Sequence, residues 1–209
     1  MQNYLMIILH FASCILHAAF YILIPMIVPI VAYGDPILKK RASDVAKNYP
    51  KLNELIADMY ETMYSSKGVG LAAPQVGFSI RLFIVDGSPF EEEEINGLKQ
   101  VFINPVIQEE GKLWKFNEGC LSIPTVREDV MRKEKLTINY YDENWKLKNE
   151  TYSGLAARVI QHEYDHLEGV LFIDRISPLR KRLIKGKLAD ISKGDVDVDY
   201  KMKFPLIRK

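Results

Sequence analysis

The segment Ala157–Phe172 reads ARVIQHEYDHLEGVLF and contains two histidines four residues apart, His162 and His166, with Glu163 directly after the first. Residues at positions i and i+4 of a helix lie on one face, so both imidazole rings can bind one ion. Glu163 lies about 100° round such a helix from His162, where it can reach a metal-bound water without being a ligand. This His-Glu-x-x-His pattern is typical of a hydrolase helix that supplies two metal ligands and a general base.

The alternative is a surface helix with two solvated histidines. Three apolar neighbours, Val159, Ile160 and Leu167, indicate instead that this helix is buried. Burying two histidines and a glutamate without partners would be costly, so the metal interpretation is favoured.

A third metal ligand is needed, because catalytic metal sites commonly use three protein ligands. The two other histidines, His10 and His17, lie in an unusual N-terminal segment, and outside that segment the only cysteine is Cys120, in the stretch EGCLS. A thiolate is a good ligand for a first-row transition metal. A lone cysteine is more often an inert buried thiol, but the missing ligand favours coordination by Cys120. The rival set His10, Cys14 and His17 lacks a nearby acidic base, and we interpret its helical spacing as coincidence.

A glycine-rich loop, GVGLAAPQVG, occupies residues 68–77. Gly68 and Gly70 let the backbone approach a ligand closely, and Gln75 offers a neutral amide that can donate to an oxygen gaining negative charge. The phosphate-loop pattern is absent, because no Gly-Lys pair closes the segment. Taken alone, this loop would be a tight turn with one polar side chain, and its weight comes from the other two segments.

Length and composition are those of one globular domain. The chain has 209 residues, 48% hydrophobic and 26% charged, which allows a substantial core. The net charge of +1 gives no strong field that would favour nucleic acid or an anionic membrane as the partner. The two cysteines argue against a disulfide framework and fit a reducing cytoplasm.

The N-terminal segment carries no Asp, Glu, Lys or Arg before Asp35 and is long enough to span a bilayer as a helix. It lacks the basic start of a secretory signal. Because Met26 opens MIVPIVAYGDPILKK, which looks like the start of a cytosolic enzyme, we expect residues 1–25 to be an over-extended translation start rather than an anchor. Membrane contact is expected only if they are an anchor.

Hydrophobic periodicity predicts an α+β fold of mixed or antiparallel sheets around a central helix that carries the His-Glu-x-x-His pattern, with a C-terminal helix. The apolar positions Leu52, Leu55, Ile56, Met59 and Met63 predict one helix, and a second is expected from near Ser153 past His166. Strands are expected at residues 80–85, 101–107 and 135–152, the last with a hairpin at residues 142–144. Residues 116–129 are rich in turn formers, and residues 91–94 (EEEE) are expected at a solvated hairpin tip. A final helix is expected after Pro178, with the catalytic domain over residues 26–185 and a polar tail over residues 186–209.

Three segments together resemble one family, the peptide deformylases. They are GVGLAAPQ at residues 68–75, EGCLS at residues 118–122 and QHEYDH at residues 161–166, and the resemblance extends from about Met26 to about Ser177. It implies a hydrolase that removes the formyl group from N-formylmethionyl nascent peptides and releases formate. A metal-bound hydroxide would attack the formyl carbon.

The resemblance also implies roles for individual residues. Cys120, His162 and His166 would be the metal ligands and Glu163 the general acid/base, with Gln75 and the Leu121 N–H stabilising the oxyanion. Glu118 and Arg132 would form an ion pair that steadies the cysteine loop. The implied substrate contacts are Arg127 and the Gly70 backbone, which would pair with an extended peptide, and a methionine pocket at Val69 and Leu155.

The metal implied by the family is Fe(II), one ion per chain, with Zn(II), Ni(II) or Co(II) as substitutes. The expected location is the cytoplasm. The ribosome is expected as a further docking partner, and the sequence carries no nucleic-acid-binding motif. Native metal, oligomeric state and preference beyond formylmethionine stay open.

Two other functions were weighed. A zinc peptidase with the same helix pattern would take its third ligand downstream, but no later histidine exists, and Glu168 is too close to His166. An inactive, membrane-anchored or ribosome-docked binding protein would explain the apolar start and the basic run of residues 180–187. Such a run is more often a solvated helix face, and the intact site residues favour an enzyme.

Overall fold

The computed structural model describes residues 25–88, 95 and 97–206. The expected start or anchor at residues 1–25 therefore lies almost wholly outside the described residues, as does the glutamate run at 91–94. Within the described residues, no helix is long and apolar enough to cross a membrane.

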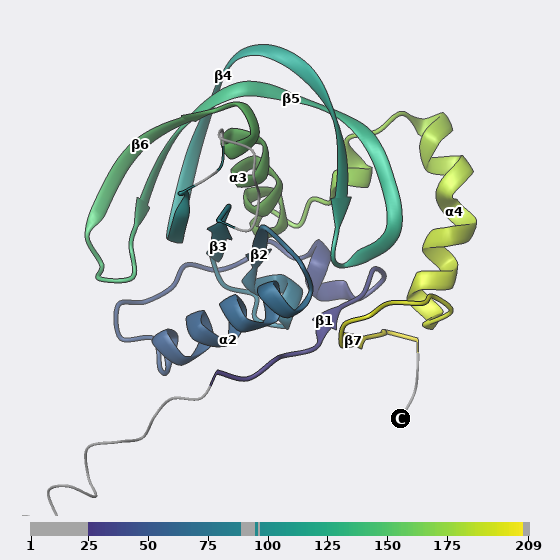
Figure 1. The fold of residues 1–209 in the computed structure, drawn as a ribbon, viewed down its shortest axis with the longest axis horizontal. Helices are drawn as coiled ribbons and strands as arrows, with labels where there is room; N and C mark the ends of the chain where they lie inside the picture. Colours follow the sequence, from purple (N-terminus) through teal and green to yellow (C-terminus); the bar gives the residue numbers. More distant parts are fainter. Residues whose placement is uncertain (1–24, 89–94, 96, 207–209) are drawn as a thin grey trace, which may run out of the picture.

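The fold is α+β, as predicted, with one helix held against a curved antiparallel sheet (Figure 1). The larger sheet has the order β2-β3-β4-β5-β6, and a two-stranded parallel sheet pairs β1 with β7. The strands are β1 (Ile30–Val31), β2 (Gly70–Ala72), β3 (Leu82–Asp86), β4 (Lys99–Cys120), β5 (Ile123–Tyr141), β6 (Leu147–Ser153) and β7 (Met202–Lys203). The helices are η1 (Pro36–Lys39), α2 (Leu52–Ser65), η2 (Ala73–Val76), α3 (Gly154–Leu167), η3 (Phe172–Asp174) and α4 (Pro178–Lys193).

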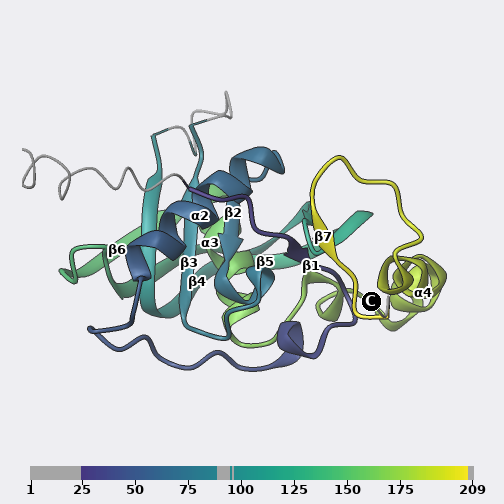
Figure 2. The ribbon, with the colours of Figure 1, turned by 90° about the horizontal axis from the view of Figure 1, so that it is seen from below.

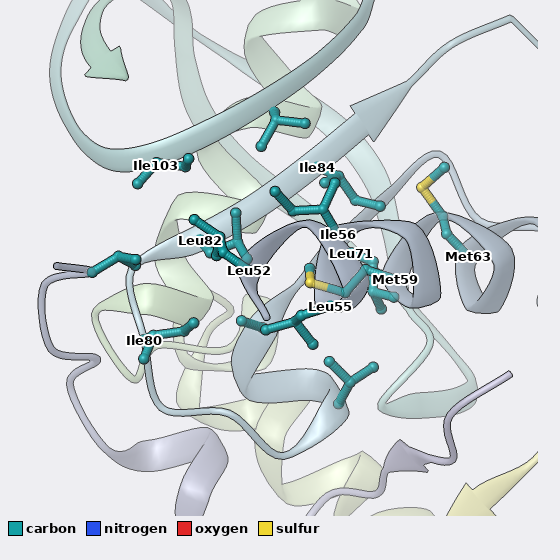
Figure 3. Close-up of a cluster of buried hydrophobic side chains, with 14 of the residues drawn as sticks. Leu52, Leu55, Ile56, Met59, Met63, Leu71, Ile80, Leu82, Ile84 and Ile103 are labelled. Atoms are coloured by element: carbon teal, nitrogen blue, oxygen red, sulfur yellow. The ribbon is translucent and has the colours of Figure 1, made fainter. Parts of the chain in front are cut away.

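Helix α2 forms where the apolar period predicted it. Its buried residues include Leu52, Leu55, Ile56, Met59 and Met63, which pack against Leu71, Leu82 and Ile84 of β2 and β3 (Figure 3). This cluster places β2 in the interior, so the first half of the glycine-rich segment is a buried strand and the rest continues as η2. Packing of this face, rather than helix propensity, stabilises α2.

The expectation of a turn-rich segment at residues 116–129 was largely wrong. These residues continue β4 and β5 as a long ribbon, and the chain reverses only between Cys120 and Ile123. Exposed and buried positions alternate along β5, so Arg127 and Asp129 face solvent while Glu128 between them is buried. Register shifts near Ile103, Glu110 and Gly119 are bulges that bend the ribbon.

Helix α3 follows β6 directly. Gly154 has φ +58°, a left-handed conformation that glycine adopts without steric cost, and it turns the chain from strand into helix. Ala157, Ile160 and Leu167 pack on the sheet beside Phe102 and Tyr140. The curved strands β4, β5 and β6 enclose α3 (Figure 1), so its polar residues must find partners inside the protein.

Helix α4 lies at one side of the molecule, and the chain after it returns toward the centre (Figure 2). There β7 pairs in parallel with β1, with Ile30 opposite Met202 and Val31 opposite Lys203. The expected boundary between residues 185 and 186 falls inside α4, which ends at Lys193.

Candidate metal centre and active site

Three side chains predicted as metal ligands lie together beside α3. The Sγ atom of Cys120 and a ring nitrogen of each of His162 and His166 all lie within 4.8 Å of one another. The Sγ atom is 3.3 Å from Nε2 of His166. The cysteine comes from the tip of the β4–β5 ribbon and the histidines from α3, so the cluster joins segments more than forty residues apart in sequence.

The surroundings of the two histidines suit a cation. Nδ1 of His162 is 3.0 Å from Oε2 of Glu118, which leaves Nε2 to face the cluster, as expected of a metal-binding histidine. Burial lowers the pKa of His162, but hydrogen bonds to Cys120 and Glu118 raise it to about 10, so a cation that binds this ring must displace a proton from it. Burial lowers the pKa of His166 well below its ordinary value, and neutral imidazole is the form that binds metals.

The donor set fits a first-row transition metal. One thiolate and two imidazoles suit zinc, iron, nickel or cobalt and do not suit magnesium or calcium, which prefer oxygen ligands. The fit is supported by Oε2 of Glu163, a buried polar atom beside the cluster that has no hydrogen-bond partner among the described residues.

Glu163 is buried beside this cluster, with 4% of its surface exposed. Burial raises its pKa to about 7, although His162 and Arg132 lower it. The side chain also lies against Gly70 of β2, where an added Cβ would be 2.6 Å from Oε1. Gly70 is therefore required for close packing between the loop and the carboxylate.

Gln75 is held in one orientation. Its Oε1 accepts a hydrogen bond from the Ala72 N–H at 2.8 Å, so its amide NH₂ points the other way. Nε2 lies 3.5 Å from Sγ of Cys120 and 3.4 Å from Oγ of Ser122. The donor predicted from the glycine-rich loop thus faces the cysteine turn.

A buried ionic network supports the cluster. Glu118 accepts hydrogen bonds from Nε of Arg132 at 2.7 Å and from Nη1 of Arg158 at 2.9 Å, besides its contact with His162. Burial alone would raise the pKa of Glu118, but the bonds to His162 and Arg132 hold it well below its usual range. Nη1 of Arg132 also donates to Asp165 at 2.7 Å. Opposite charges that hydrogen-bond to one another offset much of the cost of this burial, although Nε of Arg158 has no partner among the described residues.

Arg158 and Asp165 were missed by the sequence analysis. Arg158 is one turn before His162, so it shares that face of the helix, and this spacing could have suggested a common partner. Asp165 offered no comparable signal, because its partners Arg132 and Arg175 come from other elements.

A cavity of about 950 Å³ opens onto the cluster. Every substrate-binding residue predicted from the sequence lines it, namely Val69, Gly70, Arg127 and Leu155, together with Gln75, Leu121 and Glu163. Arg127 is held there by hydrogen bonds to the backbone oxygen of Asn117 at 2.8 Å and to its Oδ1 at 2.9 Å. The cavity is also lined by Asp197–Tyr200, which belong to the segment expected from the sequence to be only a polar tail.

Residues 27–182 match the family model of polypeptide deformylases. The chain belongs to the polypeptide deformylase family. A peptide deformylase of Christiangramia forsetii is 60% identical over 194 residues, covering 88% of this chain and 99% of the relative. One of Cytophaga hutchinsonii is 57% identical, covering 87% and 99%.

Solved structures agree with this assignment. The crystal structure of a peptide deformylase from Legionella pneumophila is 38% identical with a TM-score of 0.72, covering 81% of this chain and 97% of that one. That of the Thermotoga maritima enzyme is 42% identical with a TM-score of 0.66, covering 73% and 99%. The protein is thus a metal-dependent hydrolase that removes the N-formyl group from nascent peptides. This confirms the predicted family, enzyme class and fold.

Proposed function

We propose that Cys120, His162 and His166 hold one Fe(II) ion and that Glu163 carries the proton during deformylation of formylmethionyl peptides. The observation that carries the proposal is the convergence of three ligand atoms within 4.8 Å beside a buried carboxylate with an unpartnered oxygen. Zn(II), Ni(II) or Co(II) would suit the same donors. A cation bound there lowers the pKa of water toward about 7 and so makes hydroxide available near neutral pH.

Glu163 is suited to move a proton in both directions. With a pKa raised to about 7 by burial, its carboxylate can accept a proton from water and then return it to the departing amine. A pKa near the working pH favours such acid–base catalysis. The water oxygen forms a bond to the formyl carbon, the C–N bond breaks, and formate and a free amino terminus are released.

Gln75 and the Leu121 N–H are proposed to stabilise the negative charge that develops on the formyl oxygen. The anchored amide of Gln75 supports this, because a donor held in place before the reaction needs no reorganisation. Leu121 belongs to the turn that carries Cys120 and lines the same cavity.

The peptide is proposed to bind in extended form beside β2. The backbone of Gly70 would pair with it as an added strand, and Arg127 would contact its main chain. Val69 and Leu155, which both line the cavity, would enclose the methionine side chain. Glu118 and Arg132 would keep the cysteine turn and His162 at a fixed position relative to each other.

The proposal is tested by Glu163→Gln, which keeps the size of the side chain but removes its ability to take a proton. We expect kcat for a formyl-Met tripeptide to fall by about 10²–10⁴, while metal content stays at one ion per chain. Formate release and metal analysis after anaerobic purification are the measurements. Glu61→Gln, on the exposed side of α2, is the control and should leave both unchanged. Full turnover in Glu163→Gln would refute the assigned role.

Ribosome docking in the cytoplasm is proposed through α4. Two of its basic residues are paired, Arg180 with Glu128 and Lys181 with Asp174. Arg182, Lys185 and Lys187 are exposed and have no acidic partner among the described residues, so they are free to meet phosphates. Cosedimentation with ribosomes that weakens in Arg182→Glu and at higher salt would support docking, and binding unaffected by either change would exclude it.

A further inference from the structure

The chain after α4 crosses one side of the catalytic cavity. Gly194, with φ +81°, ends the helix, and the chain then runs back to β7 beside β1 (Figure 2). Two backbone hydrogen bonds fix it there, from Ile30 N–H to the Lys201 oxygen and from Ala32 N–H to the Lys203 oxygen, both 2.9 Å. This return segment lies beyond the part of the chain that matches the family model, which ends at residue 182.

Residues 195–201, here called the strap, contact both sides of the cavity mouth. Asp199 pairs with Lys67, which follows α2 and precedes the glycine-rich loop. The neighbouring Tyr200 lines the cavity and packs against the core cluster around α2. Its hydroxyl donates a hydrogen bond to the backbone oxygen of Leu121 at 2.8 Å.

Leu121 and Ser122 form the turn between β4 and β5, directly after Cys120. The tip of a two-stranded ribbon has few backbone partners of its own and opens readily unless other elements hold it. Here the Leu121 oxygen is held by Tyr200, and the Ser122 oxygen accepts from the Tyr33 N–H at 2.8 Å. Both restraints come from residues next to the paired strands, since Tyr33 follows β1 and Tyr200 precedes β7.

We propose that Tyr200 is a positioning residue for deformylation: by holding the Leu121 carbonyl, its hydroxyl orients the turn and aims the Leu121 N–H at the formyl oxygen. This inference rests on the proposed role of that N–H. The hydroxyl need not touch the substrate to act. The C=O and the N–H of Leu121 belong to two planar peptide units that meet at its Cα, so fixing the C=O unit limits the tilt of the turn and with it the swing of the N–H unit. A misaimed donor stabilises the transition state less while substrate binding persists.

The test is Tyr200→Phe in the full chain, which removes one hydroxyl and keeps the ring that lines the cavity. The control is Tyr141→Phe, whose hydroxyl has no hydrogen bond within the described residues and which does not line the cavity. We expect kcat for a formyl-Met tripeptide to fall on the order of tenfold, a fraction of the 10²–10³ that follows complete loss of an oxyanion donor. KM should stay within about twofold, because the wall of the cavity is intact.

Two further measurements separate positioning from folding. Metal content and thermal midpoint of Tyr200→Phe should match those of Tyr141→Phe. Hydrogen–deuterium exchange of the peptide that contains residues 119–123 should be faster in Tyr200→Phe alone, since the turn has lost one of its restraints.

Three results would overturn the inference. A kcat unchanged from the wild type would show that the turn holds its geometry without Tyr200. A raised KM with unchanged kcat would make Tyr200 only a wall of the cavity, and lost metal or a lowered thermal midpoint that accounts for the lost activity would make it only structural. Glu163→Gln measured beside it keeps the hypotheses apart: full activity there refutes the proposed function, whereas an inactive Glu163→Gln with a fully active Tyr200→Phe refutes only the role of Tyr200.

Discussion

At the scale of single residues, the site depends on close contacts between groups that ordinarily avoid burial. Glu163 stays next to the metal-ligand cluster because Gly70 leaves room for its carboxylate. Glu118 stays charged because Arg132, Arg158 and His162 surround it. Removing one partner from such a network leaves an uncompensated charge, which costs more than the contact itself contributes.

Gly70→Ala should therefore impair catalysis more than folding. The new Cβ would meet Oε1 of Glu163 at 2.6 Å and its Cδ at 2.8 Å, so the carboxylate must move away from the water it serves. We expect kcat to fall by about 10²-fold, the lower range for a displaced acid–base group, with one metal ion still bound. Steady-state kinetics and metal analysis are the measurements. Unchanged kcat would mean that Glu163 works equally well in a shifted position.

At the scale of elements, short helices and long strands bring distant segments to the site. Asp174 in η3 is one link, since it accepts from the Leu171 N–H at 2.8 Å and pairs with Lys39 of η1 and Lys181 of α4. Burial would raise the pKa of Asp174, but the bond to Lys39 and the bond from the Leu171 N–H lower it.

This lowered pKa predicts how stability depends on pH. A carboxyl group whose folded pKa is depressed stabilises the protein above its unfolded pKa, about 3.9 for Asp, and loses that contribution as the pH falls through the folded value. Asp174→Asn should therefore lower the free energy of unfolding by about 1 kcal/mol at pH 7, with a smaller difference at pH 3. Urea unfolding at both pH values measures this, with Asp190→Asn on exposed α4 as control. A difference that is the same at pH 3 would contradict the argument.

Helix α4 offers a stabilising change. Gly186 lies in its interior, and an added Cβ there would meet nothing within 4 Å. Because glycine in an exposed helix costs about 0.5–1 kcal/mol relative to alanine, Gly186→Ala should raise the thermal midpoint without altering kcat. Calorimetry measures the thermal midpoint and the formate assay measures kcat. A lowered midpoint would indicate that α4 makes a close contact at this position which only glycine allows.

At the scale of the whole molecule, the metal centre joins two parts of the fold that are far apart in sequence. Cys120 belongs to the tip of the β4–β5 ribbon, and both histidines belong to α3. A bound ion should therefore stabilise the folded chain, because the unfolded chain does not hold these three groups together.

Removing the ion should lower the thermal midpoint by several degrees and abolish formate release, and restoring Fe(II), Co(II) or Ni(II) under anaerobic conditions should return both. Cys120→Ser, which lacks the thiolate, should already have the lower midpoint and should not respond to chelator. Thermal unfolding with and without chelator measures this. A midpoint that chelator shifts equally in both proteins would place the stabilising ion elsewhere.

The features that depend on residues close in sequence were predictable, because the spacing of such residues sets their relative geometry. The i and i+4 spacing of His162 and His166 required one helix face, the apolar period required α2, and the count of available ligands pointed to Cys120. The resemblance to deformylases added Gln75, Glu118 and Arg132, which lie beside the cluster. These features depend on short-range periodicity or on motifs carried intact in the chain.

Only the tertiary structure decided the contacts between residues that are far apart in the sequence. It extended β4 and β5 through a stretch that looked like loops, because pairing across the ribbon satisfies the backbone groups of residue types that are common in turns. It also brought Arg158 and Asp165 into the network around Glu118 and laid the strap against the Cys120 turn. The sequence indicated only a polar tail over residues 186–209, so neither the strap nor its neighbour was predicted. The sequence by itself determined the chemistry of the site, whereas the pairing of β1 with β7 brought the strap to the cavity, because strand partners are chosen by packing across the whole fold and leave no local pattern.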